Sequence, residues 1–509
     1  MNGAVLNRPL LAALAGVKLL LHLLLANRYG YFRDEMYFLD CGRHLAFGYV
    51  DHAPLIALVS RAALALGGSL LALRVFPAVA GAMLVALAIL IAWRLGGGAF
   101  AQAAAGVAVI AAPVYLAVHS LLSMNAFEPL FWMGAVYVLI RIIQTGDGRR
   151  WIALGVLLGL GLENKHSTAF FGIAVAVALV LSSERRLLRT RWPWLAAGLA
   201  LVLFLPNLLW QVQHGFPTIE GLGNVRRTGK NVVLGPVDFV AQQVLMLHPV
   251  LLPVWLAGLG WLFAAARGRY RLLGWTFVAF FALLFVLKGK NYYLAPIYPM
   301  LLAAGGVALE GALQRSAVTR DRLWPKTAVL VMIVIAGSIT APMAAPILGP
   351  ERYLAYEHAL GFAPPKTEVG HRGPLPQHFG DRFGWPELVA EVARIYHALP
   401  PQDRARAAIF ANNYGEAGAV NLFGPGYGLP VAISAHQTHF LWGPRGNDGE
   451  VLIVLQDDRE SLEKICASVE EAGAHEHPWG MGEENGPIFV CRGLTPPLPE
   501  MWPRLKKWN

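Results

Sequence analysis

Long apolar stretches recur along the first 350 residues and are separated by short polar segments. They lie at about 10–26, 75–93, 99–118, 126–142, 151–162, 168–182, 194–210, 238–265, 272–287, 293–309 and 327–348. A helix needs roughly 20 apolar residues to cross a bilayer. The pattern therefore predicts about eleven transmembrane helices. The first stretch carries Lys18 and His22 and lacks a small-residue cleavage site, which favours a retained helix over a removed signal peptide.

The pattern changes after residue 350, where polar residues become frequent and apolar runs shorten to strand length. This alternation predicts a small α/β domain over 351–509, next to a membrane domain over 1–350. The expected strands are 406–411, 429–434, 450–455 and 487–492, and the expected helices are 385–398, 415–422 and 459–473. Cys466 and Cys491 can pair in an oxidising compartment, which would leave Cys41 over.

Basic residues concentrate in alternate loops of the membrane domain. The loops 141–150, 183–191, 266–271 and 311–326, with Arg8 and Arg94, carry 16 Lys and Arg, against 11 in the longer loops of the other side. Positive charge stays on the cytoplasmic side. We therefore expect a cytoplasmic N-terminus and a C-terminal domain outside the cytoplasm.

The composition excludes several classes of protein. The chain has 509 residues, of which 56% are hydrophobic and 15% charged, whereas an ordinary soluble domain is roughly 25% charged. Three cysteines are too few for a disulfide scaffold. The net charge of +10 comes largely from the loops that set topology, so nucleic acid is not an expected partner.

The first outer loop, 27–74, contains two groups of ionisable residues among aromatic and apolar neighbours. Arg33, Asp34 and Glu35 occur in YFRDEMY, and Asp51 and His52 occur in YVDHAPL. Acids at a membrane edge are often only solvated. Ionisable groups close to hydrocarbon are costly, however, and tend to be functional.

Other polar residues lie at the predicted outer ends of later spans. They are Asn125, Glu128, Glu163, Lys165, His166, Asn207, Gln211, His214, Lys288, Lys290, Asn291, Tyr292 and Tyr293. Interface anchoring by lysine and tyrosine explains each group separately. Their occurrence on one predicted side indicates a polar cavity at the outer leaflet.

These residue types suit glycosyl transfer from a lipid-linked phosphosugar. Lysines attract a phosphate, and a carboxylate deprotonates an incoming nucleophile. A lipid or sugar-lipid transporter and a non-catalytic scaffold remain as alternatives. No metal is required, although Asp34 and Glu35 could hold Mg²⁺. The pairs His436/His439 and His475/His477 lie in stretches that read as loops, so zinc is not expected.

The segment RDEMYFLDCGRHLAFGYVDHAPL resembles the first outer loop of the dolichyl-phosphate-mannose protein mannosyltransferase-like family, which includes bacterial aminoarabinose transferases. Ala53 stands where that family commonly has proline. The resemblance continues through MNAFEPLFW, LENKHSTAF, LPNLLWQVQHGFPT, YYLAPIYPMLLAAG, FANNYGEAGAV and WGP. It implies a GT-C fold of the glycosyltransferase family 39 type.

The resemblance also implies roles for individual residues. Asp34 matches the proposed catalytic base, with Glu35 beside it. Lys165 matches a basic position near the lipid phosphate, and Tyr292 and Tyr293 match a segment that lines the donor side. Asn125 stands where some relatives carry Asp, with Glu128 as a substitute. Lys288, Lys290, Arg33 and His52 are expected to hold the phosphate or orient the acids.

The partners follow from the same resemblance. We expect a polyprenyl-phosphate sugar as donor, an inverting transfer, and a lipid, glycan or protein as acceptor. The expected location is a bacterial inner membrane.

Overall fold

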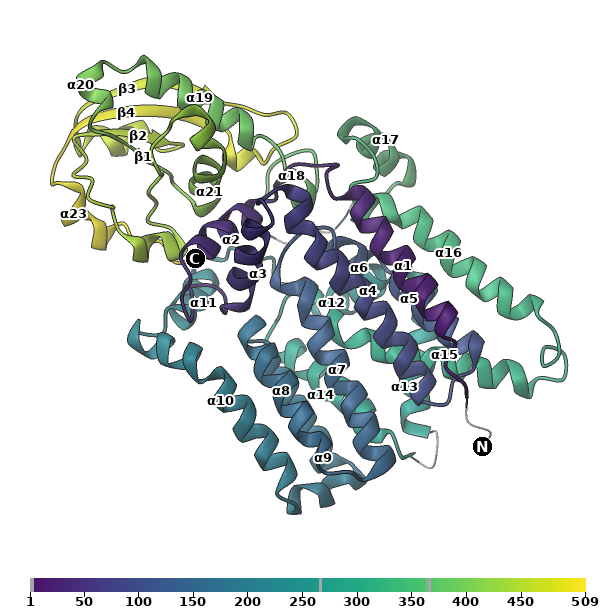
Figure 1. Ribbon diagram of the computed structural model, residues 1–509. Coiled ribbons are helices and arrows are strands. Elements are labelled where there is room, and N and C mark those ends of the chain that lie inside the picture. Colours follow the sequence, from purple (N-terminus) through teal and green to yellow (C-terminus); the bar gives the residue numbers. More distant parts are fainter. Residues whose placement is uncertain (1–3, 265–267, 363, 365–367) are drawn as a thin grey trace. The chain divides into compact units, whose positions relative to one another are not determined.

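The computed structural model describes residues 4–264, 268–362, 364 and 368–509 (Figure 1). Part of the expected loop 266–271 lies outside these residues. The chain divides into two compact units. We call Met1–Ala26, Arg74–Leu209 and Val233–Ile347 the helical unit. We call Asn27–Leu73, Trp210–Val232 and Leu348–Asn509 the mixed unit. The first outer loop is thus grouped with the C-terminal residues.

The helical unit consists of apolar helices joined by short connections. They are α1 (Arg8–Leu25), α4 (Leu70–Arg94), α5 (Ala99–Ala111), α6 (Pro113–Val118), α7 (Met124–Thr145), α8 (Arg150–Asn164), α9 (Thr168–Leu181), α10 (Trp192–Gln213), α12 (Pro236–Leu247), α13 (Leu252–Ala264), α14 (Arg271–Val286), α15 (Tyr298–Arg315) and α16 (Trp324–Ala344), with 3-10 helices η1 (Ser183–Arg189), η2 (Pro249–Leu251) and η4 (Asn291–Ile297). The first residues of α4, up to Leu73, and the last residues of α10, from Trp210 on, belong to the mixed unit.

Every apolar stretch expected from the sequence coincides with helical structure, but not every one is a straight span. Within the described residues, six helices are long and apolar enough to cross a membrane, or up to eight if each bent pair is one span. The stretch 238–265 is bent by 94° between α12 and α13, where His248 has φ +92°. The count of eleven stays a prediction.

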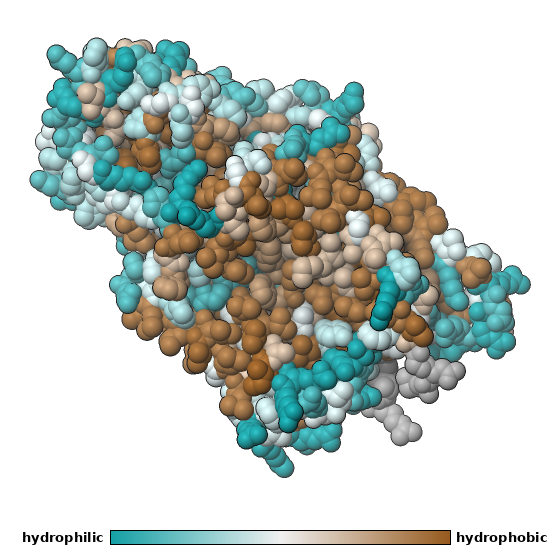
Figure 2. Space-filling model, viewed as in Figure 1, coloured by the Kyte–Doolittle hydropathy of each residue, from teal (hydrophilic) through white to brown (hydrophobic). Residues whose placement is uncertain are grey.

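The helical unit exposes apolar side chains along its helices. On α10, Val202 is 63% exposed, and on α16 Ile335 is 55% exposed. Figure 2 shows apolar residues gathered over these helices, as expected of surfaces that face lipid. Inside the unit, α13 and α15 approach closely at Gly258 and Gly305, where an added Cβ would meet the backbone of the other helix.

The mixed unit is built around a four-stranded sheet in the order β1-β2-β4-β3. Its strands are β1 (Ala407–Phe410), β2 (Val451–Leu455), β3 (Cys466–His475) and β4 (Gly486–Leu494). β1 pairs parallel with β2, and β4 pairs antiparallel with both β2 and β3. All five residues of β2 are buried, because both faces of the sheet are covered.

The helices of the mixed unit come from all three of its segments. They are α2 (Arg33–Arg43), α3 (Leu55–Ala65), α11 (Pro217–Thr228), α17 (Pro350–Leu360), α18 (Gln377–Gly380), α19 (Trp385–Ala398), α20 (Pro401–Arg404), α21 (Tyr414–Phe423), α22 (Arg459–Glu463) and α23 (Leu498–Met501), with 3-10 helices η5 (Gly424–Tyr427), η6 (Gln437–Trp442), η7 (Gly482–Glu484) and η8 (Trp502–Arg504). One face of the sheet forms a core with α19 and α21, and Met36 of α2 joins the same core.

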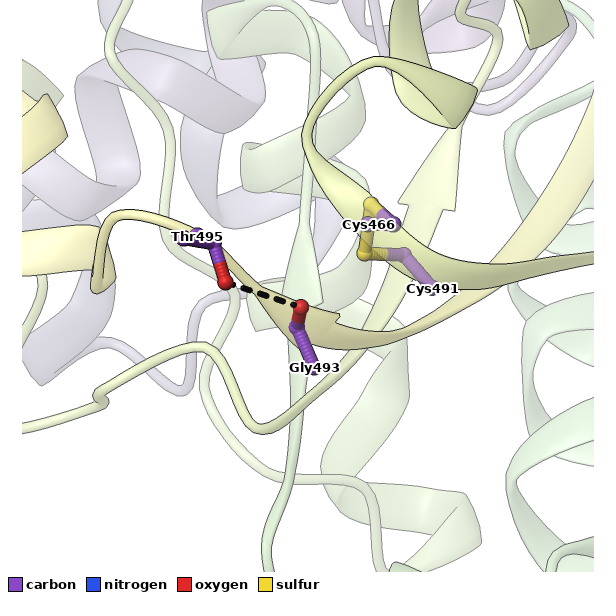
Figure 3. The surroundings of a disulfide bond; sticks show 4 residues. All are labelled: Cys466, Cys491, Gly493 and Thr495. Atoms are coloured by element: carbon purple, nitrogen blue, oxygen red, sulfur yellow. Dashed lines mark hydrogen bonds between the residues drawn. A yellow bond between two sulfur atoms is a disulfide. The ribbon is translucent and has the colours of Figure 1, made fainter.

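Three of the four expected strands and two of the three expected helices are confirmed. The strand 429–434 is wrong, since only an isolated bridge joins Ile433 to Phe410. The helix 459–473 is also wrong, since α22 ends at Glu463 and β3 follows. The residues of β3 have no strong strand preference, so pairing with β4 decides their conformation. A disulfide between Cys466 and Cys491 joins β3 to β4 (Figure 3), and Cys41 is free and buried.

Candidate functional site

The two acids of the first outer loop, Asp34 and Glu35, have different surroundings at the start of α2. Glu35 is fully buried, and its Oε2 accepts a hydrogen bond from the backbone N–H of Phe32 at 2.8 Å. It therefore caps the N-terminus of α2. Asp34 Oδ1 accepts a hydrogen bond from the hydroxyl of Tyr414 at 2.8 Å. The two carboxylates thus use different partners.

Asp34 is partly exposed, whereas most residues around it are buried. Burial raises the pKa of Asp34, and Arg33 and the hydrogen bond from Tyr414 act in the opposite direction. In the described part of the chain, no hydrogen bond to Asp34 Oδ2 is present.

Arg33 connects the start of α2 to the C-terminal part of the mixed unit. One terminal nitrogen of its guanidinium, Nη1, lies 3.7 Å from Asp381 Oδ1 and 3.6 Å from Glu484 Oε1. The guanidinium carbon lies 5.5 Å from the centre of the Tyr414 ring. Its aliphatic stem passes Gly415, where an added Cβ would come within 2.8 Å of Arg33 Cδ. Glycine is required there for Arg33 to keep this path.

More than one carboxyl group lies near the single positive charge of Arg33. Asp381 is fully buried, and burial raises its pKa to about 8 although Arg33 opposes this. Burial also raises the pKa values of Glu484 and Glu416. Asn413 donates to Glu484 Oε2 at 2.9 Å. Asp381 is therefore largely protonated near neutral pH, which reduces the negative charge around Asp34.

His52 lies in an aromatic environment that includes two residues of α2, Tyr37 and Phe38. Its Nδ1 donates to the carbonyl oxygen of Ala53 at 2.9 Å, and its ring stacks on Tyr49 with centroids 4.5 Å apart. Phe38 contacts it edge-on at 5.2 Å. Burial lowers the pKa of His52. Among the described residues, no hydrogen bond or ion pair joins His52 to Asp34.

In the helical unit, Lys165 lies directly after α8 and faces the first turns of α7. Its Nζ donates to Asn125 Oδ1 at 2.7 Å and to Glu128 Oε2 at 3.1 Å. The same ammonium lies 4.3 Å from the centre of the Tyr293 ring, which belongs to η4. Three segments distant in sequence thus meet at one lysine.

The neighbouring predicted residues join this cluster to different extents. Tyr292 lies 5.9 Å from Lys165 Nζ and 6.0 Å from Lys290 Nζ, measured to its ring centre. Lys288 is exposed after α14, with φ +53°. Within the residues that the structure describes, no hydrogen bond, ion pair or cation–π contact links Lys288 to Lys165. Glu128 is held on its second oxygen by the hydroxyl of Ser167.

A metal site is not found among the residues that the structure describes, since they contain no group of three or more His, Cys, Asp or Glu side chains arranged to hold an ion. The histidine pairs serve local contacts instead. His436 Nδ1 accepts from the backbone N–H of Tyr414, and His477 Nδ1 accepts from that of Gly480. Asp34 and Glu35 have separate hydrogen-bond partners, so they do not form a ready-made Mg²⁺ pair.

Sequence reasoning did not find Tyr414, Asp381 or Glu484. The segment FANNYGEAGAV, which contains Tyr414, carries the family resemblance, but nothing in its local pattern assigns it to Asp34. The hydrogen bond spans 380 residues of sequence. Only folding of α21 against α2 brings the two together (Figure 1).

Comparison with known proteins places these residues in a family context. Residues 51–210 match the model of the dolichyl-phosphate-mannose-protein mannosyltransferase family. The family resemblance expected from the sequence is thus confirmed. The matched part of the chain includes His52, Asn125, Glu128 and Lys165, and it begins after Asp34. No curated protein sequence matches the chain.

Two solved structures of ArnT show the same fold over nearly the whole chain. ArnT from Cupriavidus metallidurans bound to undecaprenyl phosphate superposes with a TM-score of 0.59 at 15% identity, covering 94% of this chain and 97% of ArnT. The apo form of the same ArnT gives a TM-score of 0.58 at 15% identity, covering 95% and 97%. The oligosaccharyltransferase AglB from Archaeoglobus fulgidus, in complex with an inhibitory peptide and a dolichol-phosphate, gives 0.48 at 12% identity, covering 83% and 64%. The two ArnT matches show that the chain has the GT-C fold, and its long apolar helices agree with an integral membrane protein.

Proposed function

We propose that the protein is a membrane glycosyltransferase that takes a sugar from a polyprenyl-phosphate donor and transfers it, with inversion, to an acceptor outside the cytoplasm. The observation that carries this proposal is the Asp34 carboxylate, which accepts a hydrogen bond from Tyr414 on one oxygen and none from a described residue on the other. The family match supports the reaction class. The structure of ArnT bound to undecaprenyl phosphate supports the donor class.

Asp34 acts as the general base in this proposal. Its Oδ2 accepts the proton of an acceptor hydroxyl as the hydroxyl oxygen attacks the anomeric carbon. The bond from that carbon to the phosphate oxygen breaks, and polyprenyl phosphate leaves with the electron pair. Burial makes Asp34 a stronger base than an exposed aspartate by raising its pKa. Glu35 supports this role by capping α2 rather than by contacting substrate.

Lys165 binds the donor phosphate. An ammonium group has three N–H donors, and Asn125 and Glu128 take two of them. The third is available for a phosphate oxygen, with the Tyr293 ring on the same ammonium. Lys290, whose ammonium lies near the Tyr292 ring, is proposed as a second basic residue for the phosphate. Lys288, two residues earlier, is proposed to assist it.

The membrane orientation is also part of the proposal. The denser Lys and Arg in the loops 141–150, 183–191 and 311–326 support a cytoplasmic side for those loops. The disulfide of the mixed unit is suited to an oxidising compartment. Both features support an orientation with the C-terminal part outside the cytoplasm, and the proposed location is a bacterial inner membrane with that part in the periplasm.

The test uses full-length protein in lipid nanodiscs with a panel of polyprenyl-phosphate sugars, and cell extract as the source of acceptors. Release of polyprenyl phosphate is followed by mass spectrometry. We expect release from one donor, and a loss of about 10²–10⁴-fold in Asp34→Asn. Asp321→Asn serves as the matched control, because Asp321 is 80% exposed in another loop.

Two results would contradict the proposal. Near-normal release by a correctly folded Asp34→Asn would remove Asp34 as the base. Absence of release from every donor, together with movement of intact sugar lipid across the bilayer, would support the transporter. Lys165→Ala should raise KM for the donor and also lower kcat, because its ammonium binds the donor phosphate and stabilises the further negative charge that the phosphate gains as the bond to the sugar breaks.

A further inference from the structure

Tyr414 and Asp34 come from opposite ends of the chain and meet in the mixed unit. We propose that Tyr414 is a positioning residue for the catalytic base, which holds the Asp34 carboxylate so that Oδ2 is presented to the acceptor. The C-terminal part of the chain then completes the catalytic apparatus rather than forming a separate accessory module. This inference rests on the proposed role of Asp34 as base.

The side chain of Tyr414 is fixed on several sides. Its backbone N–H donates to His436 Nδ1 at 3.3 Å, and its ring lies 4.9 Å from the rings of both His436 and Tyr37, measured between centroids. Asn413 caps α21 by accepting from the N–H groups of Gly415 and Glu416. The phenol is therefore already oriented before any substrate arrives.

The close approach of α21 to α2 is what brings the hydroxyl within reach of Asp34. A Cβ added at Gly415 would clash with the stem of Arg33, and one at Gly418 would come within 2.9 Å of Met36 Cβ and 3.0 Å of its carbonyl carbon. Two glycines thus allow the two helices to lie almost in backbone contact. Bulkier residues would move the hydroxyl of Tyr414 away from Asp34.

The hydroxyl also favours the ionised form of Asp34, alongside Arg33 and against burial. The charged and titratable groups around this carboxylate are Arg33, Asp51, His52, Glu368, Asp381 and Tyr414. A hydrogen bond donated to an ionised carboxylate favours the ionised form. Loss of the hydroxyl therefore raises the pKa of Asp34.

Tyr414→Phe separates positioning from packing, because phenylalanine keeps the ring and its stacking and removes only the donor. We expect kcat to fall about 10-fold or more, since a hydrogen bond to a charged group is lost. KM for the donor should stay within about twofold, since Tyr414 does not contact the phosphate in this proposal. The acidic limb of the kcat/KM profile should move to higher pH. Tyr427→Phe is the matched control, because Tyr427 is 45% exposed in the same part of the chain.

A double-mutant cycle based on Tm tests the same contact without an activity assay. It compares the wild type, Tyr414→Phe, Asp34→Asn and the double variant between pH 5 and 8.5. We expect the Tm loss from Tyr414→Phe to grow with pH when Asp34 is present, because the hydrogen bond strengthens as Asp34 ionises. In the Asp34→Asn background the loss should not depend on pH.

The outcomes distinguish this inference from the proposed function. If Asp34→Asn is inactive while Tyr414→Phe has the kcat and pH profile of the wild type, the positioning role is overturned and the glycosyltransferase stands. If no donor reacts, the proposed function fails. In that case equal pH-independent Tm losses in both backgrounds would overturn the Tyr414–Asp34 contact as well.

Discussion

Asp381 lies fully buried beside Arg33, and burial raises its pKa to about 8. The nearest guanidinium nitrogen is 3.7 Å away, which is too far for a hydrogen bond, so the ion pair offsets burial only in part. Asp34 and Glu484 raise the pKa further. In the unfolded chain the same side chain titrates near pH 4.

Replacing Asp381 by Asn should therefore make stability less dependent on pH. An acid with a higher pKa in the folded state takes up a proton on folding. The free energy of unfolding therefore falls as pH rises from about 4 to about 8. The slope is at most about 1.4 kcal/mol per pH unit. Between pH 5 and 7 the wild type should lose about 2.5 kcal/mol through this group, and the variant none of it.

Thermal melting of the wild type and of Asp381→Asn in detergent, between pH 5 and 8, measures this difference in pH dependence. For a domain of 150–250 residues, about 2.5 kcal/mol corresponds to a Tm change of roughly 5–10 °C. Asp457→Asn, at a partly exposed aspartate of the same unit, should leave the wild-type pH profile unchanged. If the Tm difference between Asp381→Asn and the wild type is constant from pH 5 to 8, Asp381 is ionised throughout and the reasoning is refuted.

Two further predictions concern the glycine at α21 and the disulfide. Gly415→Ala should displace the flexible Arg33 side chain and reduce sugar transfer, at a stability cost of about 1–3 kcal/mol by Tm. Its control is Gly426→Ala, where an added Cβ meets nothing within 4 Å; equal activity of the two variants would contradict the argument. Cys466→Ser should lower stability by about 3 kcal/mol because it opens a loop of 25 residues. Reductant should lower the stability of the wild type by a similar amount. If Cys466→Ser is as stable as the oxidised wild type, the disulfide contributes little to stability.

The sequence predicted features that depend on local pattern. Apolar stretches of membrane length, the helix at 385–398 and the three confirmed strands follow from hydrophobic periodicity within one segment. The acidic residues of the first outer loop were also recognisable, because their type and their place beside apolar stretches carry the signal.

Tertiary structure decided the features that depend on partners far along the chain. β3 has an ambiguous local preference, and pairing with β4 decides it. Asp34 and Glu35 look equivalent in sequence, yet one caps a helix and the other meets Tyr414, 380 residues away. Composition and periodicity determine which surfaces must be buried, whereas the contacts of a single carboxylate depend on how distant helices pack against each other.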